Sequence, residues 1–135
     1  MSHSNDLEDI VRTVIDCGYH LLCDLGPGLL EGASELILSN LVERRGFAVR
    51  RQVPIQIKND GGFVDNAFKI DLIVEGKLLI ELKSTERNSP VYAKQVLSYL
   101  HLMDLPLGVL MNFGQPIFKG GLQRVANNYF GPVQS

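Results

Sequence analysis

Ala67-Phe-Lys-Ile-Asp-Leu-Ile-Val74 and Leu78-Leu-Ile-Glu-Leu-Lys83 are two short apolar segments, joined only by the turn residues Glu75-Gly76-Lys77. Apolar runs of this length with a turn between them predict two neighbouring strands. Both runs contain charged residues, and a charge on a largely buried strand is unfavourable unless it is paired or binds a metal ion. The first candidates for a functional site are therefore Asp71, Glu81 and Lys83.

The length of the turn decides which of these charged residues face each other. A three-residue loop centred on Gly76 places Asp71 directly opposite Glu81, with both side chains on one face of the sheet. A two-residue loop places Asp71 opposite Ile80 instead. Glu81 and Lys83 are two residues apart, so they project from the same face of their strand in either case.

The pair of carboxylates points to a cation. Two acids opposite each other repel unless a cation lies between them, and carboxylates with a main-chain carbonyl suit Mg²⁺ or Mn²⁺. The Lys83 ammonium would then orient a water molecule or neutralise charge developing on a phosphate. These groups together would support metal-assisted phosphodiester hydrolysis. The alternative is that Glu81 and Lys83 simply form the solvated face of a half-exposed strand.

The remaining elements predict a mixed α/β sheet flanked by helices. Periodicity and capping residues predict helices from Asn5 or Asp6 to about Gly26, over residues 30–45, and from Ser89-Pro90 to about residue 103. Strands are predicted at 47–58, with a bend at Pro54, and at 107–112. A short edge strand is predicted at 115–118 and a short helix at 121–128. Three strands, a crossover helix and a further strand favour one sheet covered by helices.

Length and composition limit the classes of function. The chain has 135 residues, of which 45% are hydrophobic and 21% charged, and its formal net charge is -2. These values are typical of one folded domain over residues 1–135, and we expect a loose tail from about residue 130. The slightly negative charge argues against a strongly basic nucleic-acid coat protein.

The sequence also gives expectations for the location of the protein, its two cysteines and its basic residues. No run of 18 apolar residues predicts a membrane span, and the first residues lack the layout of a signal peptide, so we expect a cytoplasmic protein without a membrane partner. Cys17 and Cys23 lie on different faces of one predicted helix, which predicts two reduced core thiols. A basic cluster would either contact phosphates or remain solvated, and consists of Arg44, Arg45, Arg50 and Arg51.

The ordered polar residues resemble a known enzyme superfamily. Asp71, followed after a hairpin by Glu81-Leu82-Lys83, resembles the signature of the PD-(D/E)XK nuclease superfamily, whose core is a helix, three strands, a helix and a strand. Gln95 and Tyr99 share one helix face and resemble the Gln-x-x-x-Tyr motif of its exonuclease branch. More narrowly, Gly28-Leu-Leu-Glu31-Gly-Ala-Ser34 resembles the motif of the GxxExxY family, with Ser34 in place of the final Tyr. The resemblance covers roughly residues 6–128.

The resemblance implies a ligand set for a metal ion. Asp71 and Glu81 would ligate Mg²⁺ or Mn²⁺ together with the carbonyl of Leu82. Glu31, at the start of the second helix, would reach the metal directly or through water. Glu35 lies one helical turn later and is the competing choice for that role.

The resemblance also implies the reaction and the partners. Lys83 would position or activate the attacking water, and Gln95 and Tyr99 would hold the site or the nucleic-acid strand. The implied function is a metal-dependent nuclease that hydrolyses phosphodiester bonds, with DNA favoured over RNA and with a homodimer as a source of additional surface. The alternative, from a different class, is a nuclease-fold protein that binds nucleic acid or another protein without turnover.

Overall fold

A five-stranded mixed sheet organises the part of the chain that the computed structural model describes, which is residues 6–131, with side chains everywhere except at 58–59 and 63–67. The strands lie in the order β1-β2-β3-β4-β5, and only β3 and β4 are parallel neighbours. The elements in chain order are α1 (Leu7–Leu25), α2 (Glu31–Arg44), β1 (Val49–Asn59), β2 (Gly62–Val74), β3 (Leu78–Lys83), α3 (Pro90–Met103), β4 (Leu107–Asn112), the 3-10 helix η1 (Phe118–Gly121) and β5 (Leu122–Ala126). The predicted mixed sheet with a crossover helix is confirmed.

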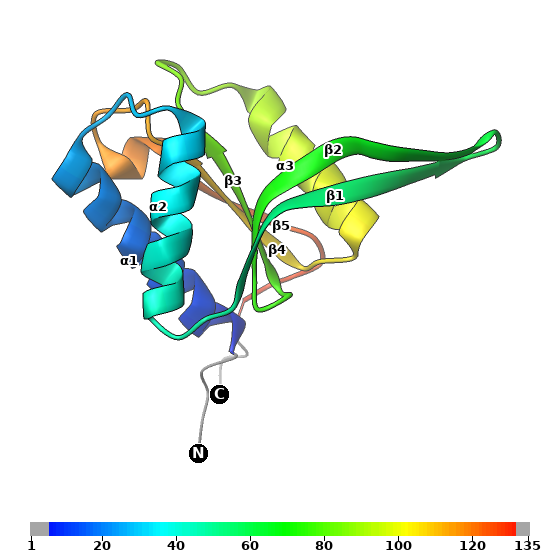
Figure 1. The fold of residues 1–135 in the computed structure, drawn as a ribbon, viewed down its shortest axis with the longest axis horizontal. Coiled ribbons are helices and arrows are strands. Elements are labelled where there is room, and N and C mark those ends of the chain that lie inside the picture. The colour runs from blue at the N-terminus through cyan, green and yellow to red at the C-terminus, as the bar shows by residue number, and fades with distance from the viewer. Residues whose placement is uncertain (1–5, 132–135) are drawn as a thin grey trace.

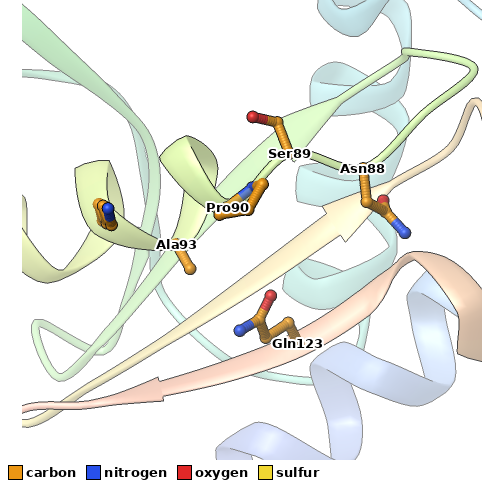
Figure 2. Close-up of a pocket in the computed structure, with 6 residues that line it drawn as sticks. Asn88, Ser89, Pro90, Ala93 and Gln123 are labelled. Atoms are coloured by element: carbon orange, nitrogen blue, oxygen red, sulfur yellow. The ribbon is translucent and has the colours of Figure 1, made fainter.

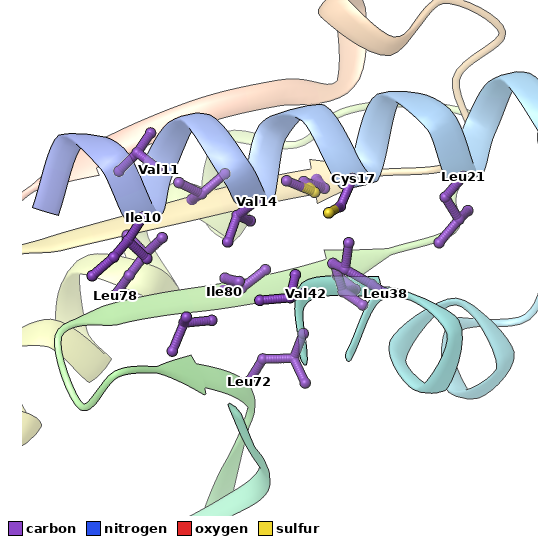
Figure 3. Packing of buried hydrophobic residues seen from close by; sticks show 14 of the residues in the cluster. Ile10, Val11, Val14, Cys17, Leu21, Leu38, Val42, Leu72, Leu78 and Ile80 are labelled. Atoms are coloured by element: carbon purple, nitrogen blue, oxygen red, sulfur yellow. The ribbon is translucent and has the colours of Figure 1, made fainter. Parts of the chain in front are cut away.

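Helices cover both faces of the sheet (Figure 1). On one face α1 and α2 pack against alternate strand residues, and Figure 3 shows Ile10, Val14 and Val42 meeting Leu72 and Ile80. On the other face α3 packs against the remaining positions, which include Ile73 and Leu79. Burial on both faces explains why the middle strands are almost continuously apolar.

The predicted helix starts and the β2–β3 turn are confirmed. The Asp6 side chain accepts a hydrogen bond from the Glu8 N–H at 3.4 Å at the start of α1, and Ser89 Oγ accepts from the Val91 N–H at 3.3 Å at the start of α3. In the turn, Glu75 and Gly76 have φ values of 55° and 66°, a left-handed conformation that favours glycine. This turn fixes the register between β2 and β3.

The predictions for the last part of the chain are wrong. Residues 115–118 form no strand, and residues 121–128 form no helix, because η1 and then β5 occupy this region. Leu122 and Val125 are three residues apart, which fits one face of a helix, but β5 pairs with the open edge of β4. In a strand this spacing sends the two side chains to opposite faces, and each of them packs against a different core cluster.

The β1–β2 hairpin is longer than the sequence predicts. Strand β2 begins at Gly62 rather than at Ala67, and the outer part of the hairpin extends beyond the rest of the sheet (Figure 1). Pro54 lies in the edge strand β1, where its missing N–H is tolerated, and the register shifts between Ile55 and Ile57. Strand β2 stays paired with β1 beyond Asp71, whereas its pairing with β3 ends at Leu72, so the candidate site lies at the base of the protruding part of the hairpin.

Three further expectations concern the chain as a whole. Both cysteines are free thiols, as expected. Cys17 is buried in the core, but Cys23 is exposed, so the prediction that both are core residues is wrong for Cys23. No helix among residues 6–131 is long and apolar enough to cross a membrane. The expected loose tail falls mainly on residues 132–135, which lie outside the described residues, and the single-domain organisation stays a prediction.

Candidate functional site

The register of the β2–β3 hairpin brings Asp71 and Glu81 together. The pairs Leu72–Ile80 and Val74–Leu78 are those of a three-residue loop, so the two-residue alternative is wrong. The next pair along this register is Asp71 and Glu81, and the Asp71 N–H donates to Glu81 Oε1 at 3.1 Å. The two carboxylates are therefore cross-strand neighbours, as the alternative with a three-residue loop predicts.

Each carboxylate also binds the backbone of the opposite strand. The Leu82 N–H donates to Asp71 Oδ2 at 2.8 Å, which mirrors the bond from the Asp71 N–H to Glu81. The paired ladder ends at Leu72 and Ile80, and side-chain oxygens act as acceptors for the two N–H groups beyond that point. These bonds fix both carboxylates at the end of the paired segment of β2 and β3.

Burial makes the ionised form of this pair unfavourable. The exposed fraction of Glu81 is 6%, so this residue does not belong to a solvated strand face. Burial, followed by the charge of Asp71, raises the pKa of Glu81 to about 8. Burial also raises the pKa of Asp71 to about 6, and the charges of Glu35 and Glu31 act in the same direction. A nearby cation would stabilise the ionised forms, and Lys83 already acts on both groups in that sense.

Helix α2 adds two more carboxylates with different surroundings. Glu31 is the first helical residue, and its Oε1 accepts from the Ser84 N–H at 3.3 Å, directly after the strand that carries Lys83. Glu35 is buried, and its Oε2 lies 3.0 Å from Nη2 of Arg51. Glu31 thus faces the loop after β3, whereas Glu35 is already bound by a protein cation.

Gln52 is a site residue that the sequence did not reveal. Its Nε2 donates to Glu35 Oε1 and lies 3.4 Å from Asp71 Oδ1, so its amide connects α2 with β2. Its φ is 51°, which is unusual for a residue other than glycine inside a strand. In the sequence Gln52 is one of several polar residues in an alternating strand, so the pattern does not separate it from surface residues.

Helix α3 places Tyr99 and Tyr92 beside the candidate site and carries Gln95 between them. Tyr99 is largely buried, and burial and the charges of Glu81 and Asp71 raise the pKa of its hydroxyl. Gln95 is half-buried one turn earlier on the same helix face. Tyr92, which the sequence analysis did not select, lies under Lys83, with Nζ 4.8 Å from the ring centroid. Its spacing of three from Gln95 and seven from Tyr99 is the signal that could have identified it.

The donor set fits a hard divalent cation. Buried carboxylate oxygens with raised pKa values are the ligands that such ions favour and whose charge they neutralise. The buried hydroxyl of Ser84, one residue after Lys83, has no hydrogen-bond partner among the described residues, which is consistent with a water or ion at this place. No group of three or more His, Cys, Asp or Glu side chains within the described residues is arranged to hold a metal, so Glu31 does not join Asp71 and Glu81 in a three-acid group.

Other predicted features lie elsewhere. Ser34, in the position of the motif's Tyr, is fully buried, and its hydroxyl has no hydrogen-bond partner among the described residues. Two residues of the basic cluster are bound within the protein, Arg45 by Asp16 and Arg51 by Glu35.

A cavity of about 500 Å³ lies at the start of α3 (Figure 2). Its wall contains none of the predicted site residues and consists of Asn88, Ser89, Pro90, Ala93, Lys94 and Gln123.

Comparison with known proteins gives one positive result. The model of the PD-(D/E)XK nuclease superfamily matches residues 8–125 of the chain. This range includes all five strands except the last residue of β5, and it includes every site residue described above. No match to a curated protein or to a solved structure was found.

Proposed function

The chain belongs to the PD-(D/E)XK nuclease superfamily, and we propose that it hydrolyses phosphodiester bonds in nucleic acid with the help of Mg²⁺ or Mn²⁺. The observation that carries this proposal is the buried Asp71–Glu81 pair with the charge of Lys83 acting on both members. Such a pair is unfavourable for stability, which is typical of functional rather than structural positions.

The proposed roles follow from the position of each group. Asp71 and Glu81 hold the cation, with the carbonyl of Leu82 as a third ligand. When bound, the cation supplies charge stabilisation for the attacked phosphate. Lys83 orients the attacking water through a hydrogen bond from its ammonium, at a fixed position over the Tyr92 ring. Glu31 contributes from the start of α2, directly or through water, since its charge acts on both acids.

Helix α3 closes the other side of the proposed site. The charges of Glu81 and Asp71 contribute to the raised pKa of the Tyr99 hydroxyl, so this hydroxyl lies near both acids. We propose that Tyr99 and Gln95 bind the nucleic-acid strand beside the reacting phosphate. The GxxExxY subgroup, a preference for DNA over RNA, a homodimer and a cytoplasmic location complete the proposal.

Metal binding is the first test. Calorimetric titration of the purified protein with Mn²⁺ should give one binding event that is lost in Asp71→Asn and in Glu81→Gln. Lys119→Met, on the exposed 3-10 helix η1, is the matched control and should bind Mn²⁺ as the wild type does. A wild type that binds no divalent ion contradicts the proposed site.

Cleavage is the second test. End-labelled single-stranded and duplex DNA and RNA of one sequence should be compared in Mg²⁺ and Mn²⁺, together with a supercoiled plasmid. Lys83→Met should lose at least 100-fold in rate while its circular dichroism and Mn²⁺ affinity stay near those of the wild type. A protein that binds Mn²⁺ and nucleic acid but cuts none of these substrates supports the alternative, a binding module without turnover.

A further inference from the structure

Gln52 has a left-handed backbone inside β1, between Val49, which packs on the α1 and α2 side of the sheet, and Val53, which packs on the α3 side. The residues on either side pair regularly with β2, as Arg51 with Leu72 and Val53 with Ile70, which places Gln52 opposite Asp71. Its φ of 51° is nevertheless left-handed, and an L-residue adopts this conformation only when its surroundings compensate for the strain. Contacts made by Gln52 must therefore offset the strain of this conformation.

The left-handed conformation lets two consecutive side chains reach one carboxylate. In a regular strand Arg51 and Gln52 would project to opposite faces of the sheet. Here Arg51 Nε donates to Glu35 Oε2 at 3.1 Å, and Gln52 Nε2 donates to Oε1 of the same carboxylate. The amide of Gln52, an exposed residue, also approaches Asp71 Oδ1 at 3.4 Å, so one neutral donor bridges two acids.

The bridge completes the set of donors around Asp71. Oδ2 accepts from the Leu82 N–H on one strand, and Oδ1 faces Gln52 on the other. Partners of this kind orient a carboxylate that binds a metal, and their loss commonly weakens metal affinity or activity by about 10- to 100-fold. A neutral amide does this without adding a positive charge that would compete with a cation.

We infer that Gln52 is a positioning residue of the metal site: its amide holds Glu35 away from the cation and fixes the orientation of Asp71 toward it. The inference rests on the proposed function, since it concerns the same cation. It adds a residue from β1 to a site otherwise formed by α2, β2, β3 and α3. The left-handed backbone of Gln52 lets its amide and the Arg51 guanidinium reach Glu35 together, while the amide stays beside Asp71.

Two substitutions separate the amide from the backbone strain. Gln52→Ala removes the amide and keeps the unfavourable φ, whereas Gln52→Gly removes both, because glycine adopts this conformation without strain. We expect both variants to bind Mn²⁺ at least about tenfold more weakly than the wild type in calorimetric titration. Gln52→Gly should melt at a higher temperature than Gln52→Ala. Gln123→Ala, on the edge strand β5, is the control and should keep the wild-type Mn²⁺ affinity.

Three other results of the Mn²⁺ titration would overturn the role proposed for Gln52. If both variants bind Mn²⁺ within threefold of the wild type, Gln52 does not position the site and only this inference fails. If affinity falls in Gln52→Ala but not in Gln52→Gly, the backbone rather than the amide matters, which also overturns the inference. Should Gln52→Ala fail to fold, Gln52→Gly alone decides the question. A wild type that binds no Mn²⁺ overturns the proposed function and this inference together.

Discussion

The ammonium of Lys83 lies over the ring of Tyr92, with Nζ 4.8 Å from the ring centroid. This distance is within the range of a cation–π interaction, which contributes from about 0.5 to about 2 kcal/mol depending on burial. Tyr92 is in the first turn of α3, and its hydroxyl lies 3.5 Å from Oγ1 of Thr85 in the loop that follows Lys83. The start of α3 therefore holds the side chain that the proposed reaction needs.

The first prediction separates the Tyr92 ring from its hydroxyl. Tyr92→Phe keeps the ring under Lys83 and should retain the wild-type cleavage rate within about twofold, because the hydroxyl contact is long. Tyr92→Leu removes the ring and should lower kcat by roughly 3- to 30-fold with little change in KM, since about 1.4 kcal/mol corresponds to a factor of ten. Single-turnover and steady-state assays measure both constants. Equal rates for the Leu and Phe variants would show that the ring has no such role.

The second prediction concerns stability as a function of pH without metal. The pKa of Glu81 in the folded protein is about 8, well above its ordinary value of 4.5, so the folded state holds a proton that the unfolded state releases between these pH values. The free energy of unfolding contributed by Glu81 therefore falls as the pH rises through this window. Glu81→Gln, which has no charge to lose, should be more stable than the wild type by a few kcal/mol at pH 9, with a much smaller difference at pH 5.

Thermal unfolding in EDTA at both pH values checks this expectation. Mn²⁺ provides the control, because a ligand that binds only the folded state at 100 times its Kd contributes about 2.7 kcal/mol. It should raise the melting temperature of the wild type at pH 8 and leave that of Glu81→Gln unchanged. A wild type that is more stable than Glu81→Gln at pH 9 in EDTA would mean that the Glu81 carboxyl is not destabilised by its surroundings.

The parts of the site that were predictable depend on local rules. Two apolar runs and the turn Glu75-Gly76-Lys77 limited the hairpin to two registers, and the one with a three-residue loop, which places Asp71 opposite Glu81, is the observed one. The limits of β3, α3 and β4 follow from apolar runs and from a cap with a proline behind it. The acids and the lysine of the candidate site could therefore be identified from residues 71–83 alone.

The remaining parts depend on contacts between distant segments. Gln52 contacts Glu35 from a left-handed backbone position, which no periodicity indicates. Leu122 and Val125 fit a helix equally well until the free edge of β4 is known. A spacing rule describes the face of one element, whereas the position of these residues is decided by the neighbouring element that they meet.

The third prediction concerns Asn112, which connects the two loops at the end of the sheet. Its buried side chain accepts from the N–H groups of Thr85 and Gly114 and donates to Thr85 Oγ1 and to Asn88, with each bond at 3.0 Å. These bonds fix the loop that follows Lys83, and a Cβ at Gly114 would lie 2.2 Å from the Thr85 carbonyl oxygen, so the loops are in close contact. Loss of the side chain would leave the half-buried N–H groups of Thr85 and Gly114 without this acceptor.

Asn112→Ala should therefore lower the free energy of unfolding by roughly 2–4 kcal/mol in urea denaturation, since each unsatisfied buried group costs about 1–3 kcal/mol. Asn127→Ala is the matched control, because Asn127 donates one side-chain hydrogen bond, to the Leu105 carbonyl at 3.0 Å. This variant should lose only about 1 kcal/mol. Equal losses in the two variants would contradict the role of Asn112 as the centre of a network.

The fourth prediction compares two ion pairs made by acids in the first turn of α1. Arg124 on β5 donates to both oxygens of Glu8, at 3.0 and 2.9 Å, and Tyr129 donates to Oε2 at 2.5 Å, although these residues are more than 100 positions apart in the sequence. The Arg124 hydrogen bond, followed by that of Tyr129, lowers the pKa of Glu8. Arg12 pairs instead with Asp9 within the helix and is itself mostly exposed.

Arg124→Met should lower the free energy of unfolding by about 1 kcal/mol at pH 7, because a bidentate pair with a third donor exceeds an ordinary surface pair, even though Arg124 is partly exposed. Arg12→Met should change it by less than about 0.5 kcal/mol. The Glu8 contribution is present above the ordinary glutamate pKa and is lost as the pH falls through its lowered value, so Arg124→Met and the wild type should converge in stability toward pH 3. A difference that stays constant from pH 7 to pH 3 would mean that Arg124 stabilises the protein by packing rather than through the Glu8 charge.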